Sequence, residues 1–330
     1  MTEEPSPDAA ASSGGDWQAR LARIARMRQP PQRVRGALLL VAGIAVAVGV
    51  VLSIRTLDIG WADLRLAPLL AALLLITPAT ILLNGAELKV MATIVARADQ
   101  RLGWRASLRA TVVATAANLL PIPGGALVRI AAVRSVGVRT TSATAINLVG
   151  AGAWVAAGLL IAAVAGLTVA PWGAVGVAAG LGVAGVVVVL GMIHRLSDEG
   201  ATWWSTGALF LVEGATAAVH GLRLWLVLLA LGVEASIRQG LALGAGAPLA
   251  AAAGVFPSGL GLAEALTALI APIVALPAAA GFAATALGRV VGLLGTAPLA
   301  LAFGVKDLRR RAQEFEEQAD ASDPGGPDRP

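Results

Sequence analysis

Five charged side chains fall inside long apolar segments of this 330-residue chain, and they are the first candidates for chemistry. They are three arginines and two glutamates: Arg129, Glu213, Arg223, Glu264 and Arg289. An ionisable group in an apolar environment is costly unless it is paired or hydrated, so each is a candidate functional residue. The excess of arginine makes the set net positive, and a guanidinium matches phosphate oxygens in two-point contacts. The set therefore suits an anionic headgroup such as a lipid phosphate.

The same charges also have a structural interpretation as ion pairs inside the protein. Arg129 and Glu264 lie at similar distances beyond two proline-containing breaks, which makes them one candidate pair. Arg289 and Glu213 are the other candidate pair. Headgroup contact and structural or gating pairs both stay open for these residues.

The apolar segment 207–232 carries a narrow polar face. At 100° per residue, Glu213, Thr216, His220 and Arg223 fall within an arc of about 80°, so they should face the interior of a helix bundle or a hydrated groove. His220 could relay protons, because its ordinary pKa lies near neutrality. The plainer alternative is a neutral core histidine that donates to a backbone carbonyl.

Two further apolar regions are broken in the middle by proline and glycine. Region 107–133 is interrupted at Pro121 and region 240–274 at Pro257. Each flank is too short to cross a bilayer alone but long enough for half a crossing. The pattern predicts two re-entrant hairpins.

The breaks could also help to bind an anion. The second limb of each hairpin is expected to begin near Gly125 or Gly261, and helix N-termini carry free N–H groups and partial positive charge. Two such ends near the membrane midplane would cradle an anion. Asn118 either hydrogen-bonds the opened backbone at Pro121 or contacts the substrate.

Composition indicates which elements must position these residues. Hydrophobic residues make up 57% of the chain and charged residues 14%, whereas a soluble domain is about one quarter charged. The fold class expected is an all-α polytopic integral membrane protein with about six spans and the two hairpins. The six expected spans are 36–54, 66–84, 142–168, 173–193, 207–232 and 278–304.

The positive-inside rule gives an orientation. Twenty of the 25 Lys and Arg residues fall on one side of this arrangement, which places both termini in the cytoplasm. The first hairpin then lies on the cytoplasmic side and the second on the outer side. Residues 17–35 form either a basic amphipathic helix on an anionic leaflet or a plain positive anchor.

Spacing predicts an internal repeat and the domain boundaries. The order of span, span, hairpin and span occurs twice, over about 36–168 and 173–304, with opposite orientation. Inverted repeats with broken helices at matching places are typical of transporters. A cytoplasmic tail over 1–35 precedes this 36–305 domain, and a basic then acidic tail over 306–330 follows it.

Both breaks resemble the motifs of a known family. Asn118-Leu-Leu-Pro121-Ile-Pro-Gly-Gly125-Ala-Leu-Val-Arg129 resembles the Asn-x-x-Pro…Gly-Glu-x-x-Arg motif of the lysylphosphatidylglycerol synthase transmembrane region, or flippase-like family. Pro257-Ser-Gly-Leu-Gly261-Leu-Ala-Glu264 resembles its Pro-Gly-Gly-x-Gly-x-x-Glu motif, and Arg289 matches an arginine expected in the last span. The resemblance covers about residues 36–305. It implies a lipid-translocating membrane region.

The chain departs from this pattern in one motif. Ala126 stands where the first motif usually has glutamate, which leaves the role of that carboxylate open here. Some family members carry a C-terminal aminoacyl-transferase domain, which the short stretch after Gly304 is not expected to contain.

The function expected is a flippase that moves a phospholipid, or a lipid-linked anionic or aminoacylated headgroup, between leaflets of the cytoplasmic membrane. The alternatives are a non-transporting scaffold of envelope lipid synthesis and a membrane enzyme acting on lipid-linked substrates. Expected partners are membrane phospholipid, anionic lipid of the cytoplasmic leaflet, and a second copy or an envelope-synthesis enzyme. Nucleic acid is not expected.

An enzyme is not expected, and neither is a cofactor or metal. The chain contains no cysteine, no His-Glu-x-x-His sequence and no phosphate-binding P-loop. Ser258 lacks the preceding glycine of intramembrane serine motifs, which argues against a dyad with His220.

Overall fold

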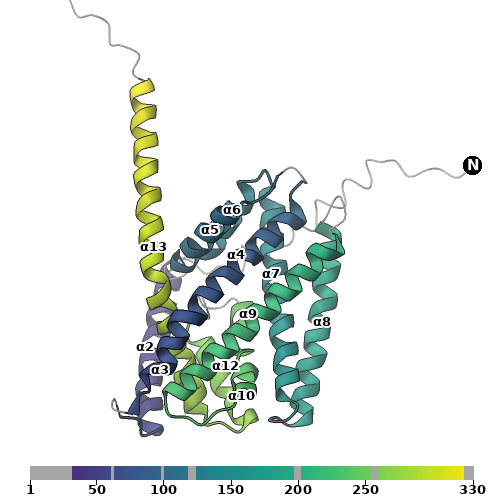
Figure 1. Cartoon of the computed structure of the whole chain (residues 1–330), viewed down its shortest axis with the longest axis vertical. Coiled ribbons are helices and arrows are strands. Elements are labelled where there is room, and N and C mark those ends of the chain that lie inside the picture. The colour runs from purple at the N-terminus through teal and green to yellow at the C-terminus, as the bar shows by residue number, and fades with distance from the viewer. Residues whose placement is uncertain are drawn as a thin grey trace, which may run out of the picture.

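The computed structural model describes residues 32–60, 63–97, 100–117, 124–196, 202–253 and 259–322. Every regular element in these ranges is helical, which confirms the all-α expectation. The predictions for residues 1–31, Asn118, Pro121, Pro257 and the acidic end of the C-terminal tail lie outside them. Figure 1 shows the helices as one bundle, from which the last helix extends.

Five helical stretches of the described chain are long and apolar enough to cross a membrane. They are Leu66–Val95, Thr140–Gly166, Trp172–Leu196, Trp203–Ala230 and Ala278–Ala300, which match five of the six expected spans. The first expected span lies in helix α2 (Gln32–Thr56). The chain is therefore a multi-pass membrane protein.

The second span is longer than the sequence predicts. It consists of α3 (Leu66–Ala71), a π-helical segment (Ala72–Ile76) and α4 (Thr77–Val95), and it continues well beyond the expected end at residue 84. The continuation follows from its periodicity, because Leu88 and Met91 are fully buried while Lys89 is exposed. This extension brings Glu87 into the protein interior.

Two helical hairpins lie toward opposite ends of the bundle in Figure 1. The first contains α5 (Trp104–Ala117) and α6 (Gly124–Arg134). The second contains α11 (Gly246–Ala253) and α12 (Leu262–Ile270), and a 3-10 turn (Ala271–Val274) follows α12. Its first limb is divided near Gly244, so α10 (Ile237–Leu243) is a separate helix, which the sequence did not predict.

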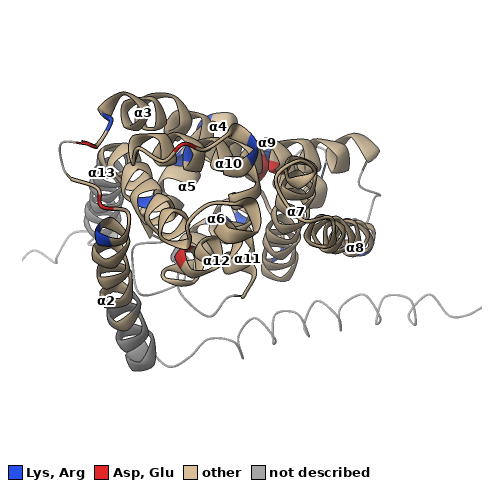
Figure 2. Ribbon diagram, turned by 90° about the horizontal axis from the view of Figure 1, so that it is seen from below, with Lys and Arg blue, Asp and Glu red and all other residues tan. Residues whose placement is uncertain are grey.

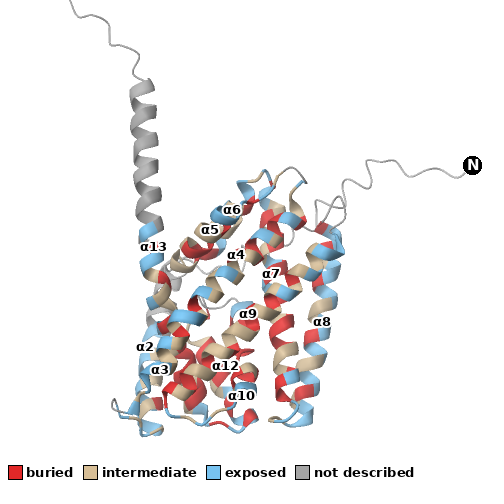
Figure 3. Ribbon diagram, viewed as in Figure 1, coloured by how far each residue is buried: buried red, intermediate tan, exposed pale blue. Residues whose placement is uncertain are grey.

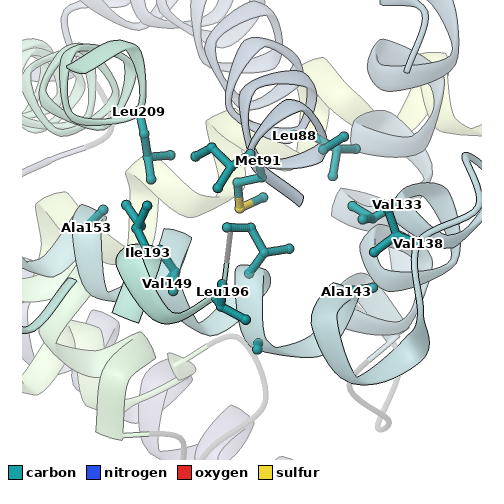
Figure 4. Packing of buried hydrophobic residues seen from close by; sticks show 14 of the residues in the cluster. Leu88, Met91, Val133, Val138, Ala143, Val149, Ala153, Ile193, Leu196 and Leu209 are labelled. Carbon is teal, nitrogen blue, oxygen red and sulfur yellow. The ribbon is translucent and has the colours of Figure 1, made fainter. Parts of the chain in front are cut away.

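Three further long helices contribute many of the side chains of the apolar core. They are α7 (Thr140–Gly166), α8 (Trp172–Leu196) and α9 (Trp203–Ala230). One buried cluster unites side chains of α4, α7, α8 and α9, including Met91, Val149 and Leu209 (Figure 4). A second cluster lies between α9, α10 and the last helix.

The last helix, α13 (Ala278–Ser322), continues without interruption beyond residue 304, where the last span was expected to end. Its 45 residues span roughly 68 Å, which is more than twice the thickness of a bilayer hydrocarbon core. Figure 1 shows its C-terminal part beyond the other helices.

The outer surface of the bundle is apolar. Exposed residues cover much of α2 and α8 in Figure 3, and on α8 they include Val177, Leu181 and Val187. Most of the ribbon in Figure 2 is uncharged. Such continuous exposed apolar surface is typical of contact with lipid.

Candidate functional site

Arg129 of α6 is held by two other helices. Its Nη2 donates to Oε1 of Glu87 on α4, and its Nε donates to Oδ1 of Asn147 on α7 at 3.2 Å. Asn147 is oriented by its own amide, which donates to the carbonyl of Ala143 at 2.8 Å. The Arg129–Glu87 ion pair therefore links the first hairpin to the second span.

Glu213 of α9 lies beside this ion pair. It interacts electrostatically with both Glu87 and Arg129. Its residue surface is 1% exposed, and Oε1 has no hydrogen-bond partner among the described residues. Glu87, Arg129, Asn147 and Glu213 are called the first polar cluster.

Glu264 of α12 is the most enclosed charged group in the described chain, with 0% exposure. Oε1 accepts from Nε of Arg289 on α13 at 2.9 Å, and Oε2 accepts from the backbone N–H of Gly261 at 2.8 Å. Gly261 has φ of 81°, a conformation that favours glycine. The carboxylate thus holds α12 against α13 and also caps the N-terminus of α12.

Arg223 and His220 lie further along α9. Nη2 of Arg223 contacts Nδ1 of His220, and because a guanidinium only donates, this contact assigns the ring proton to Nε2 of a neutral imidazole. The His220 ring meets Trp154 of α7 edge-on, with centroids 6.5 Å apart. Arg289 interacts electrostatically with both His220 and Arg223. Trp154, His220, Arg223, Glu264 and Arg289 are called the second polar cluster.

Glycine lets α13 approach Arg223 closely. A Cβ atom at Gly292 would lie 3.1 Å from Nη1 of Arg223, and one at Gly288 would lie 3.9 Å from its Nε. These glycines occupy successive turns of α13, so the guanidinium lies against a strip of backbone. The arrangement places Arg223 and Arg289 at the same contact between α9 and α13.

Both ion pairs expected from the sequence were wrong. Arg129 pairs with Glu87 rather than Glu264, and Arg289 pairs with Glu264 rather than Glu213. The reason is geometric, since the two hairpins lie toward opposite ends of the bundle and each meets the long helix beside it (Figure 1).

Glu87 is the functional candidate that the sequence reasoning missed. Its span was expected to end at residue 84, before it. The signal was the apolar spacing of Leu88, Met91 and Ala92, which continues the buried face. With Glu87 included, the two clusters contain three arginines and three glutamates, so their formal charge is zero when every carboxylate is ionised, whereas the sequence led us to expect a net positive centre.

The structure also shows the burial and hydrogen bonding of the other predicted site residues. Glu213 and Thr216 are buried, as the periodicity of this helix predicts. Nε2 of His220 has no partner among the described residues, so the expected bond to a backbone carbonyl is not found there. Gly125 is buried and Ala126 exposed, while the N–H of Gly261 is already bonded to Glu264.

The described residues include no group of three or more His, Cys, Asp or Glu that could hold a metal ion. Glu213 and Arg223 are about 15 Å apart along α9 by helical rise, so one helix carries part of both clusters.

No family model matches the chain, and no curated protein matches it in sequence. Fold and site together define a multi-pass membrane protein with buried, internally paired charges.

Proposed function

We propose that this protein is a flippase that moves an anionic or aminoacylated phospholipid between leaflets of the cytoplasmic membrane. The observation that carries the proposal is the placement of two charged clusters between apolar membrane helices. Buried ionisable groups in membrane proteins mark substrate and ion pathways. The lipid-facing surface of the bundle would keep the acyl chains in the bilayer while the headgroup passes the clusters.

The ion pairs suggest how a headgroup would be recognised. Arg129 and Arg289 are each held by a carboxylate, and a phosphate offers the same oxygen geometry to a guanidinium. A headgroup can therefore replace Glu87 or Glu264 without leaving a buried arginine unpaired. Arg223 would supply further positive charge between them. Because Arg129 already has Glu87 as a partner, it needs no carboxylate at Ala126.

The same exchange would gate the two hairpins. Arg129 ties α6 to α4, and Glu264 ties α12 to α13. When a phosphate replaces the carboxylate as the partner of the arginine, the ion pair between the hairpin and its neighbouring helix is lost. The hairpin can then move. The repeated order of span, span, hairpin and span supports an inverted repeat, in which the hairpins would open on opposite sides of the membrane.

Replacing Arg129 with Gln tests the recognition step. We expect leaflet exchange of fluorescent phosphatidylglycerol in reconstituted liposomes to slow by about tenfold or more, the equivalent of one lost charged contact. Arg238→Gln is the matched control, because Arg238 is exposed and donates to Thr168 away from both clusters. An aminoacylated phosphatidylglycerol is measured in parallel.

The outcomes separate the alternatives. Wild-type protein that gives no exchange above empty vesicles contradicts the flippase and favours a scaffold. A hydrolysed or transferred lipid product favours a membrane enzyme. Equal exchange by wild type and the Arg129 variant contradicts the assigned role of that arginine.

Orientation can be tested on the natural sequence background because the chain has no cysteine. We propose that both termini and the first hairpin face the cytoplasm. Cysteine placed at Ser135, exposed after α6, should then be protected from an impermeant maleimide in intact cells. Cysteine at the exposed Glu234, between α9 and α10, should react. The reverse labelling pattern would mean the opposite orientation.

A further inference from the structure

The first polar cluster contains more acid than base. Glu87 and Glu213 are both buried, and Arg129 is the guanidinium that meets them. One arginine neutralises one carboxylate. A second buried carboxylate without a counter-charge would cost several kcal/mol, which a buried group avoids by binding a proton.

Among the residues that the structure describes, Arg129 is the one cation found to interact with Glu213. On the helices packed against α9, the charged groups directed inward are Glu87 on α4 and Arg289 on α13. Arg289 donates to Glu264, while Arg238 of α10 is exposed and donates to Thr168. On α9 itself, Arg223 and His220 contact each other two to three turns from Glu213.

Hydrogen bonding leads to the same conclusion. Oε1 of Glu213 has no partner among the described residues, although the residue is 1% exposed. Two ionised carboxylates can only accept, so neither can satisfy the other. If one carries a proton, its O–H can donate to the neighbouring carboxylate, and carboxyl pairs that share a site typically hold one proton between them.

We propose that Glu87 and Glu213 form a proton-binding site whose occupancy is coupled to anion binding at Arg129. While Arg129 contacts Glu87, the pair holds one proton. When Arg129 turns to a phosphate, its positive charge moves away from the two carboxylates, which strengthens proton binding at Glu213 from the aqueous side. The coupling rests on the proposed flippase function, in which one proton would then accompany each anionic headgroup.

Infrared difference spectroscopy on the purified, full-length protein tests the proton site without any lipid transport. A pH change should reveal the carbonyl stretch of a protonated carboxylic acid, and Glu213→Gln should remove it. Glu234→Gln, at an exposed position, is the matched control and should leave the band unchanged. A band that persists in the Glu213 variant, or no such band in the wild type, would overturn the proposal.

Stability provides a second readout that separates a proton site from a structural ion pair. Glutamine is a neutral isostere of the protonated acid, so Glu213→Gln should leave the thermal midpoint in detergent nearly unchanged. If Glu213 were an ionised partner of Arg129, the same substitution would lower the midpoint, and that result would contradict the proposal.

Coupling is tested in liposomes with phosphatidylglycerol as the probe. Wild-type exchange should be about tenfold faster in acidic than in alkaline buffer, because proton and anion binding favour each other, and Glu213→Gln should lose this dependence. pH-independent wild-type exchange contradicts the coupling. A wild type that shows the infrared band but no lipid exchange refutes the flippase while leaving the proton site established.

Discussion

Replacement of Arg289 by Met is expected to destabilise the protein by about 3–5 kcal/mol, because breaking a buried ion pair leaves an uncompensated charge. Glu264 is 0% exposed, and its Oε1 accepts from Nε of Arg289 at 2.9 Å. The hydrogen bond from Gly261 to Oε2 stays but does not neutralise the carboxylate. Unfolding in mixed micelles, followed by circular dichroism, measures the loss.

Two matched variants identify the buried charge as the cause. Arg238→Met removes an exposed arginine and should cost under about 1 kcal/mol, which is typical of surface polar contacts. The double variant Arg289→Met with Glu264→Gln should recover much of the loss, because the remaining group is then neutral. A double variant no more stable than Arg289→Met alone would show that the ion pair is not what stabilises this contact.

Gly221→Ala is expected to destabilise the contact between α9 and α10 by about 1–3 kcal/mol or more, because overpacking a dense contact forces the backbone to shift. A Cβ atom at Gly221 would lie 2.7 Å from the Cα of Leu241 and 3.1 Å from the carbonyl oxygen of Gly240. Backbone atoms cannot rotate away as a side chain can. The helices would have to separate, which would also move the segment that leads to the second hairpin.

Gly207→Ala is the control on the same helix. No heavy atom lies within 4 Å of a Cβ placed there, so alanine should be neutral or stabilising by up to about 1 kcal/mol. The same unfolding measurement compares both variants. If Gly221→Ala matched Gly207→Ala in stability, the close approach of α9 and α10 would not hold in the membrane protein.

The helical elements could largely be predicted from sequence because their signals are local. Runs of apolar residues mark the long helices, and proline with glycine marks the hairpin breaks. Gly261 illustrates such a signal, because a residue at φ of 81° requires glycine whatever surrounds it. The division near Gly244 was missed although Gly246 and Pro248 follow it closely in the sequence.

Partner choice could not be predicted in the same way. Arg129 and Glu87 are far apart in sequence, and their contact depends on how α6 lies against α4. Arg129 and Glu264 lie at similar distances beyond two prolines, which suggested that they pair. The two hairpins that contain them lie toward opposite ends of the bundle, so each residue pairs with a helix near its own hairpin. Glu87 was missed because the second span was expected to end at residue 84, whereas the helix continues to Val95 and buries the glutamate.

The continuity of α13 has a practical consequence for imaging. Membrane proteins of this size are difficult to align as single particles, since little mass extends beyond the detergent belt. A helical fusion partner joined in register after Ser322 would continue the same helix, with its rotation set by 100° per residue. The fiducial would then continue the helix that carries Arg289, and its tilt relative to the bundle would combine movement at the second polar cluster with any bend at Pro298, which lies between them.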